Sequence, residues 1–187
     1  YEAALFYKKL RDKYCPGAQM WVTESGDAGC GGNTWASTFL DVLRSADELG
    51  RFCTVTDGVI FHNTFMSSDY GYLDHKTHLP RPNYWLALLW NRLMGVRVYD
   101  SGEEIREGLH CYVHSRKDGK KGYTYMIINN SPIQKAFIEL PGPGIRYTLS
   151  SRTLRSGETL LNGRPLTVLE TAKLPALEGE SVKAGEL

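Results

Sequence analysis

The sequence lacks any long apolar run and any excess of charge of one sign. No segment of its 187 residues approaches the roughly 20 consecutive apolar residues that a membrane-spanning helix needs. Twenty-two Lys and Arg against 21 Asp and Glu leave a net charge of +1. Electrostatics therefore give no reason to expect binding to nucleic acid or to an acidic membrane surface.

Cysteine is also scarce. The four cysteines, at positions 15, 30, 53 and 111, follow no CxxC spacing and are too few for a disulfide scaffold. We expect buried free thiols, although the residues also allow one disulfide. His62 has no second His or Cys at ligand spacing, so we expect no metal site, and nothing indicates a cofactor.

The first half of the chain alternates helical and β-prone segments. Their order is helix, strand, helix, strand, helix, which is typical of parallel strands joined by crossover helices. Asn33 or Thr34 can cap the second helix, Gly50 can stop it, and Pro82 can open the third. The five segments are residues 1–14, 20–23 (a buried strand), 35–49, 58–64 and 82–95, the last closed by Gly95.

The second half changes to short β-prone runs separated by turn signals. A charged Asp-Gly loop at Lys117 to Gly122 and an Asn162-Gly163 pair predict hairpins, and the whole region predicts an antiparallel sheet or sandwich. The fold class is thus α/β plus all-β. Two strand–helix units cannot close a parallel sheet, so both parts look incomplete, and we expect the C-terminal portion of a larger protein.

Glu24 is the first candidate for chemistry. It follows the predicted buried strand and precedes the glycine-rich loop SGDAGCGGN. A carboxylate at the end of such a strand can serve as a nucleophile or a general acid/base, or it can be an ordinary exposed acid. The loop can turn backbone N–H groups toward an anion, or it can be a plain tight turn.

The second strand leads to more candidates. His62 and Asn63 lie near its end, and the loop SSDYGYLDHKTHLPRP carries Tyr70 and Tyr72. Long loops in compact domains are usually functional, and tyrosines suit contact with a sugar or a carboxylate. The alternatives are a hydrogen-bonded structural histidine and a solvated loop whose aromatic rings cover the rim of the domain.

The segments MWVTESGDAGCGGNTWASTF, GVIFHNTFMSSDYGYLD and PRPNYWLALLWNRLMG, followed by a β-rich tail, resemble glycoside hydrolase family 79, which includes heparanase and β-glucuronidases. The resemblance implies a (β/α)8 TIM barrel followed by an antiparallel β-sandwich. Residues 1–98 would supply the last strand–helix units of the barrel and residues 99–187 the sandwich. It also favours a secreted or periplasmic protein, a location that the residues themselves leave open.

The resemblance further implies retaining hydrolysis of β-linked glucuronic acid, with Glu24 as nucleophile. The acid/base belongs to an Asn-Glu pair on the fourth barrel strand, which would precede Tyr1. Its absence leads us to expect that the 187 residues alone are inactive. The substrate, a glucuronic-acid-containing oligosaccharide or glycoside, would contact five further residues: Cys30, Gly31, Asn63, Tyr70 and, as a substitute for Tyr70, Tyr72.

Two other interpretations stay open from the sequence. The chain can be an inactive fragment or relative that binds acidic glycans without cleaving them. A stand-alone adhesion module would explain residues 96–187 but would leave the stretch around Glu24 unexplained.

Overall fold

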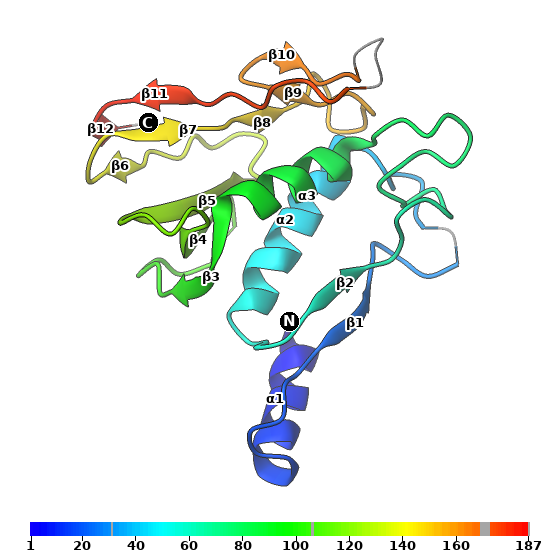
Figure 1. Ribbon diagram of the computed structural model, residues 1–187, viewed down its shortest axis with the longest axis vertical. Helices are drawn as coiled ribbons and strands as arrows, with labels where there is room; N and C mark the ends of the chain where they lie inside the picture. The colour runs from blue at the N-terminus through cyan, green and yellow to red at the C-terminus, as the bar shows by residue number, and fades with distance from the viewer. Residues whose placement is uncertain (31, 106, 169–172, 187) are drawn as a thin grey trace.

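The computed structural model describes residues 1–30, 32–105, 107–168 and 173–186. It combines helices with several antiparallel sheets (Figure 1). The predicted order of the first half is confirmed. Its elements are α1 (Glu2–Tyr14), β1 (Val22–Ser25), α2 (Phe39–Cys53), β2 (Ile60–His62) and α3 (Pro82–Leu93).

Strands β1 and β2 form the expected parallel pair. Val22 pairs with Ile60 and Ser25 with His62, with an irregularity in between. The prediction of a buried strand was wrong, because Ser25 is the one buried residue of β1. The physical reason is visible in Figure 1: α2 and α3 cover one face of the pair, and within the described residues β1 has β2 as its single neighbour.

Helix α2 begins at Phe39, later than predicted, and neither of the expected caps at positions 33 and 34 serves it. Backbone carbonyls from the second half of the chain take over this function. Ser156 accepts a hydrogen bond from the N–H of Phe39 at 2.9 Å, and Leu154 accepts one from Leu40 at 2.7 Å. This second half of the chain, the tail, thereby satisfies two of the N–H groups that a helix start leaves without partners.

The second half is antiparallel throughout its described strands, as predicted. The Asp118-Gly119 loop joins β4 to β5, and Asn162-Gly163 joins β9 to β10 with φ angles of 51° and 77°, so both hairpins are confirmed. The strands are β3 (Met94–Tyr99), β4 (Leu109–Arg116), β5 (Tyr123–Asn129), β6 (Glu139–Leu140), β7 (Gly144–Arg146), β8 (Leu149–Ser150), β9 (Leu160–Leu161), β10 (Arg164–Pro165), β11 (Glu180–Val182) and β12 (Gly185–Glu186).

Two predicted helix stops are packing glycines. Gly50 lies inside α2, where an added Cβ would stand 2.4 Å from the ring of Tyr112. Gly95 lies inside β3, where a Cβ would stand 2.4 Å from the carbonyl oxygen of Ser115. The prediction of a stop was wrong for Gly50, because α2 continues to Cys53. It is confirmed for the position of Gly95, because α3 ends at Leu93 with Met94 as its C-cap. At both glycines the missing side chain allows a close approach to β4.

Helices α2 and α3 lie between the β1–β2 pair and the strands of the second half (Figure 1). The hydrophobic core consists of two clusters of buried side chains, and each joins helix residues to tail residues. One contains Phe39, Val42, Ala46, Leu86, Tyr112 and Ile128. The other contains Trp85, Leu89, Leu161 and Leu177.

All four cysteines are free thiols. The expectation of burial was wrong for Cys15 and Cys30, which are exposed. Cys53 is partly buried at the end of α2, and burial raises the pKa of its thiol to about 11.

Candidate functional site

Glu24 and Asn63 form a direct contact across the parallel pair. The side-chain amide of Asn63 donates to Oε1 of Glu24 at 2.5 Å. The backbone N–H of Asn63 donates to the carbonyl of Ser25 at 2.7 Å, which continues the pairing one residue beyond β2. The carboxylate of Glu24 is therefore held in one orientation while its side chain stays open to solvent.

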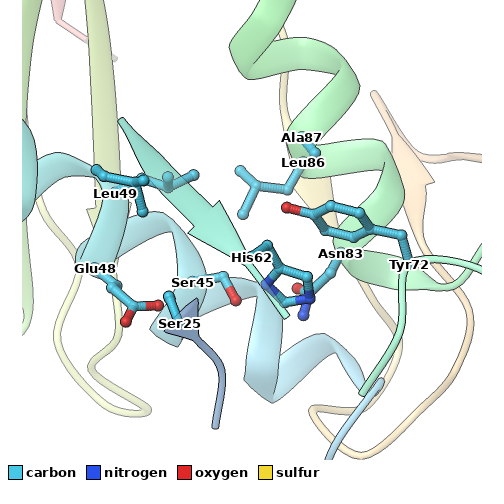
Figure 2. A pocket seen from close by; sticks show the side chains of 10 residues that line it. Ser25, Ser45, Glu48, Leu49, His62, Tyr72, Asn83, Leu86 and Ala87 are labelled. Carbon is cyan, nitrogen blue, oxygen red and sulfur yellow. The ribbon is translucent and has the colours of Figure 1, made fainter. Parts of the chain in front are cut away.

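The opposite face of the pair lies against the helices. Because side chains alternate along a strand, Ser25 points away from Glu24. Ser25 and His62 line a small cavity of about 40 Å³ together with polar residues of α2 and α3 (Figure 2). This cavity belongs to the interface between strands and helices, and it lies behind the carboxylate rather than in front of it.

The structure places Tyr72 in that cavity and not beside Glu24. Its ring stacks on His62 with centroids 4.1 Å apart and planes 17° apart. Burial raises the pKa of Tyr72 to about 12, and the nearby carboxylates of Glu48 and Asp41 act in the same direction. The hydroxyl therefore stays protonated at any ordinary pH.

Tyr70 is buried between β2 and the glycine-rich loop. An added Cβ on Gly32, whose φ is +83°, would stand 2.8 Å from the Tyr70 ring, so this residue must be glycine for the loop to lie there. Asp27 fixes the same loop by accepting the backbone N–H of Asn33 at 2.7 Å. Cys30 is exposed with φ +59°, and Gly31 lies outside the described residues.

Two charged residues, neither of them among the predicted site residues, hold the long loop in shape. Nη1 of Arg81 donates to the carbonyls of Ser68, at 2.8 Å, and Asp69, and its Nη2 donates to Asp74 at 2.9 Å. Asp74 also accepts the backbone N–H groups of Lys76 and Thr77.

These hydrogen bonds hold the pKa of Asp74 well below its usual range. The bond from the backbone N–H of Thr77 has the largest effect, followed by the bond from Arg81. The spacing of Asp74 and Thr77 is the local signature of a side chain that caps its own turn. It could have indicated the function of Asp74, whereas no local signal marks Arg81.

Other kinds of site find no support in the described part of the chain. Those residues contain no group of three metal-ligating side chains. None of the helices described is long and apolar enough to cross a membrane.

Comparison with known proteins gives a consistent set of relatives. The chain matches no protein-family model. It is 35% identical to heparanase-like protein 1 of Arabidopsis thaliana over 148 residues, covering 79% of this chain and 27% of the relative. It is 27% identical to inactive heparanase-2 of Homo sapiens over 203 residues (95% and 34%) and 27% identical to baicalin-beta-D-glucuronidase of Scutellaria baicalensis over 168 residues (86% and 32%).

The chain is related to the heparanase-type proteins. It spans 27–34% of the length of these three relatives, so what the whole protein does is a matter of proposal.

Proposed function

We propose that the protein containing this chain is a retaining glycosidase that acts on β-linked glucuronic acid, with Glu24 as its nucleophile. The observation that carries the proposal is the solvent-open carboxylate of Glu24, oriented by Asn63 at 2.5 Å. Relatives named for heparanase and glucuronidase activity support the same class of reaction.

In the proposed reaction, one carboxylate oxygen of Glu24 attacks the anomeric carbon and the bond to the leaving oxygen breaks. A second carboxyl group protonates that oxygen, and it then takes a proton from the water that hydrolyses the glycosyl-enzyme ester. Retaining enzymes hold the two carboxyls about 5–5.5 Å apart. We assign the second carboxyl to sequence outside the 187 residues, in a missing N-terminal barrel segment.

The proposed architecture follows from the same assignment. Residues 1–98 form the last strand–helix units of a (β/α)8 barrel, and residues 99–187 form an antiparallel β-sandwich. The parallel β1–β2 pair, covered by α2 and α3 on one face, supports the first part. The antiparallel strands of the tail support the second.

For the substrate carboxylate we propose the backbone N–H groups of Cys30 and Gly31 together with Tyr70. Contact between the Tyr70 ring and the glycine-rich loop supports this grouping. The stacking of Tyr72 on His62 favours Tyr70 over Tyr72 for this contact. Asn63 then contacts both Glu24 and the sugar.

The test replaces Glu24 in the full-length protein. Glu24→Gln keeps the size of the side chain but removes the attacking charge, and we expect hydrolysis of an aryl β-glucuronide to fall by at least about 10³-fold, the order seen when a nucleophile is removed. A mechanism-based 2-fluoro-glucuronide should add its mass to a peptide containing Glu24 in the wild type and not in the variant.

Asp27→Asn is a suitable control, because it alters a carboxylate of the adjacent loop that already accepts a backbone N–H. It should retain far more activity than Glu24→Gln. Near-normal turnover by Glu24→Gln would contradict the assignment of Glu24 as the nucleophile.

The second candidate function is binding of acidic glycans without cleavage. The similarity to inactive heparanase-2 favours it. An Asn-Glu pair at the end of a fourth strand, encoded upstream of Tyr1, supports the enzyme, and a protein without that pair supports the binding function.

A further inference from the structure

His62 connects the two parts of the proposed site. Its neighbour Asn63 holds Glu24 on the open face of β2. Its own side chain points to the opposite face, and there its Nε2 lies 3.1 Å from the backbone carbonyl oxygen of Tyr70. The last residue of β2 and the residue after it thus contact the tyrosine loop and the carboxylate, respectively.

The direction of this hydrogen bond follows from its partner. A carbonyl oxygen can only accept, so the Nε2–H of His62 donates and fixes the protonation state of that nitrogen. Burial lowers the pKa of His62. The neutral ring with its proton on Nε2 is therefore the form that this environment favours.

The ring of His62 has little freedom to turn away from Tyr70. Tyr72 stacks on it at 4.1 Å, and the backbone N–H of Tyr72 is in turn bound to the carbonyl of Thr64 at 3.1 Å. Ser45 and Asn83 close the cavity from the helix side (Figure 2). Tyr72 thus covers one face of the imidazole, and side chains of α2 and α3 line the cavity that His62 enters.

We propose that His62 is a positioning residue, which holds Tyr70 against the glycine-rich loop and so sets the recognition of the substrate carboxylate. The inference rests on the proposed function, in which Tyr70 contacts that carboxylate. Because the Tyr70 ring already touches the position of a Gly32 Cβ, a shift of the Tyr70 backbone also displaces the loop that carries Cys30.

Two variants of the full-length protein separate the hydrogen bond from the packing. His62→Phe keeps a ring to stack on Tyr72 and removes the donor. His62→Gln removes the ring and keeps an N–H donor at similar reach. Ser45→Ala, which alters the same cavity from α2, is the matched control.

The measurements are KM and kcat for an aryl β-glucuronide, with melting temperatures to show that each variant is folded. Since carboxylate binding is common to the ground and transition states, His62→Phe should raise KM about tenfold and change kcat less than about threefold, the size of effect that one lost hydrogen bond gives. His62→Gln and Ser45→Ala should stay within about threefold of the wild-type KM.

A fall in kcat at unchanged KM would overturn the proposal, because it would place the effect at Glu24. Equal KM changes in His62→Phe and His62→Gln would also overturn it, because they would show that packing alone matters. If His62→Phe fails to fold, His62→Gln decides: a wild-type KM supports the proposal and a raised one contradicts it.

Failure of the proposed function is a separate outcome. If the wild-type protein does not cleave the glucuronide, the affinity for glucuronic acid replaces KM, and His62→Phe should weaken it about tenfold by calorimetry. A wild type that neither cleaves nor binds glucuronic acid would contradict both proposals.

Discussion

At the scale of single residues, how well the sequence predicts a residue's function depends on how many functions that residue type can have. Glu24 follows a β-prone run in the sequence, and the structure gives its carboxylate a fixed orientation through Asn63. Tyr70 and Tyr72 looked interchangeable in the sequence. The structure places them in different environments, since Tyr70 contacts the glycine-rich loop and Tyr72 stacks on His62.

Glycine also has more than one function, because it can end a helix or make room for a neighbouring side chain. Gly50 follows a helical pattern and therefore looked like a stop, but the reason for glycine at this position is the Tyr112 ring, which comes from a strand 62 residues further along the chain. No pattern near Gly50 could indicate that contact.

The first prediction concerns this position. Gly50→Ala gains about 1 kcal/mol of helix propensity, but its Cβ overlaps a ring that is 3% exposed and bonded to Asp47 at 2.5 Å. We expect a net loss of about 1–2 kcal/mol in the free energy of unfolding. Denaturant titration measures it. Gly142→Ala, where nothing lies within 4 Å of the new Cβ, is the control and should be nearly neutral.

At the scale of elements, one carboxylate joins α2 to β4. Asp47 accepts hydrogen bonds from the Tyr112 hydroxyl at 2.5 Å and from Arg51 at 2.8 Å, and its Oδ1 lies 2.5 Å from Nδ1 of His110. Burial alone would raise the pKa of Asp47, but the bonds to Tyr112 and His110 outweigh it and lower the pKa.

The pH dependence of this junction has a definite sign. Because the folded pKa lies below the unfolded value of about 3.9, the unfolded state binds more protons near pH 4. The stabilisation is therefore complete above about pH 5 and is lost as the pH falls through the folded pKa.

Asp47→Asn should accordingly cost about 2 kcal/mol at pH 7, and the difference from wild type should shrink as the pH falls below about 4. Urea titrations of both proteins from pH 7 to pH 3 measure it. A difference that stays constant over this range would show that the charge of Asp47 does not stabilise the junction. Asp118→Asn, in an exposed hairpin, is the control and should have little effect.

At the scale of the whole molecule, both clusters of buried side chains join residues on either side of the boundary proposed near residue 98. The tail also caps α2 through the carbonyls of Leu154 and Ser156. Helix α2 and the tail strands thus share one core rather than packing separately.

This sharing predicts a single unfolding unit. In native-state hydrogen exchange, the amides of Phe39 and Leu40 should open with the same free energy as the β4 amides that pair with β5. If the free energy of opening of the β4 amides exceeds that of the α2 amides by more than about 1 kcal/mol, α2 and the β4–β5 hairpin open as two separate units.

Local sequence patterns predict the order of helices and strands, the start of α3 at Pro82 and the hairpins at Asp118-Gly119 and Asn162-Gly163. These features depend on local periodicity and turn chemistry, which act over a few residues. Local sequence also makes Glu24 a candidate, because an acid and a flexible loop after a strand are neighbours in the chain.

The face that each side chain occupies, and the distant group that it contacts, depend on how the elements pack in three dimensions. The bond from Asn63 to Glu24, the function of Arg81 in holding the long loop, and the separation of Tyr70 from Tyr72 all arise where β2 and its loop meet other elements. These contacts join segments far apart in sequence, and they form only when hydrophobic burial brings the helices and strands together.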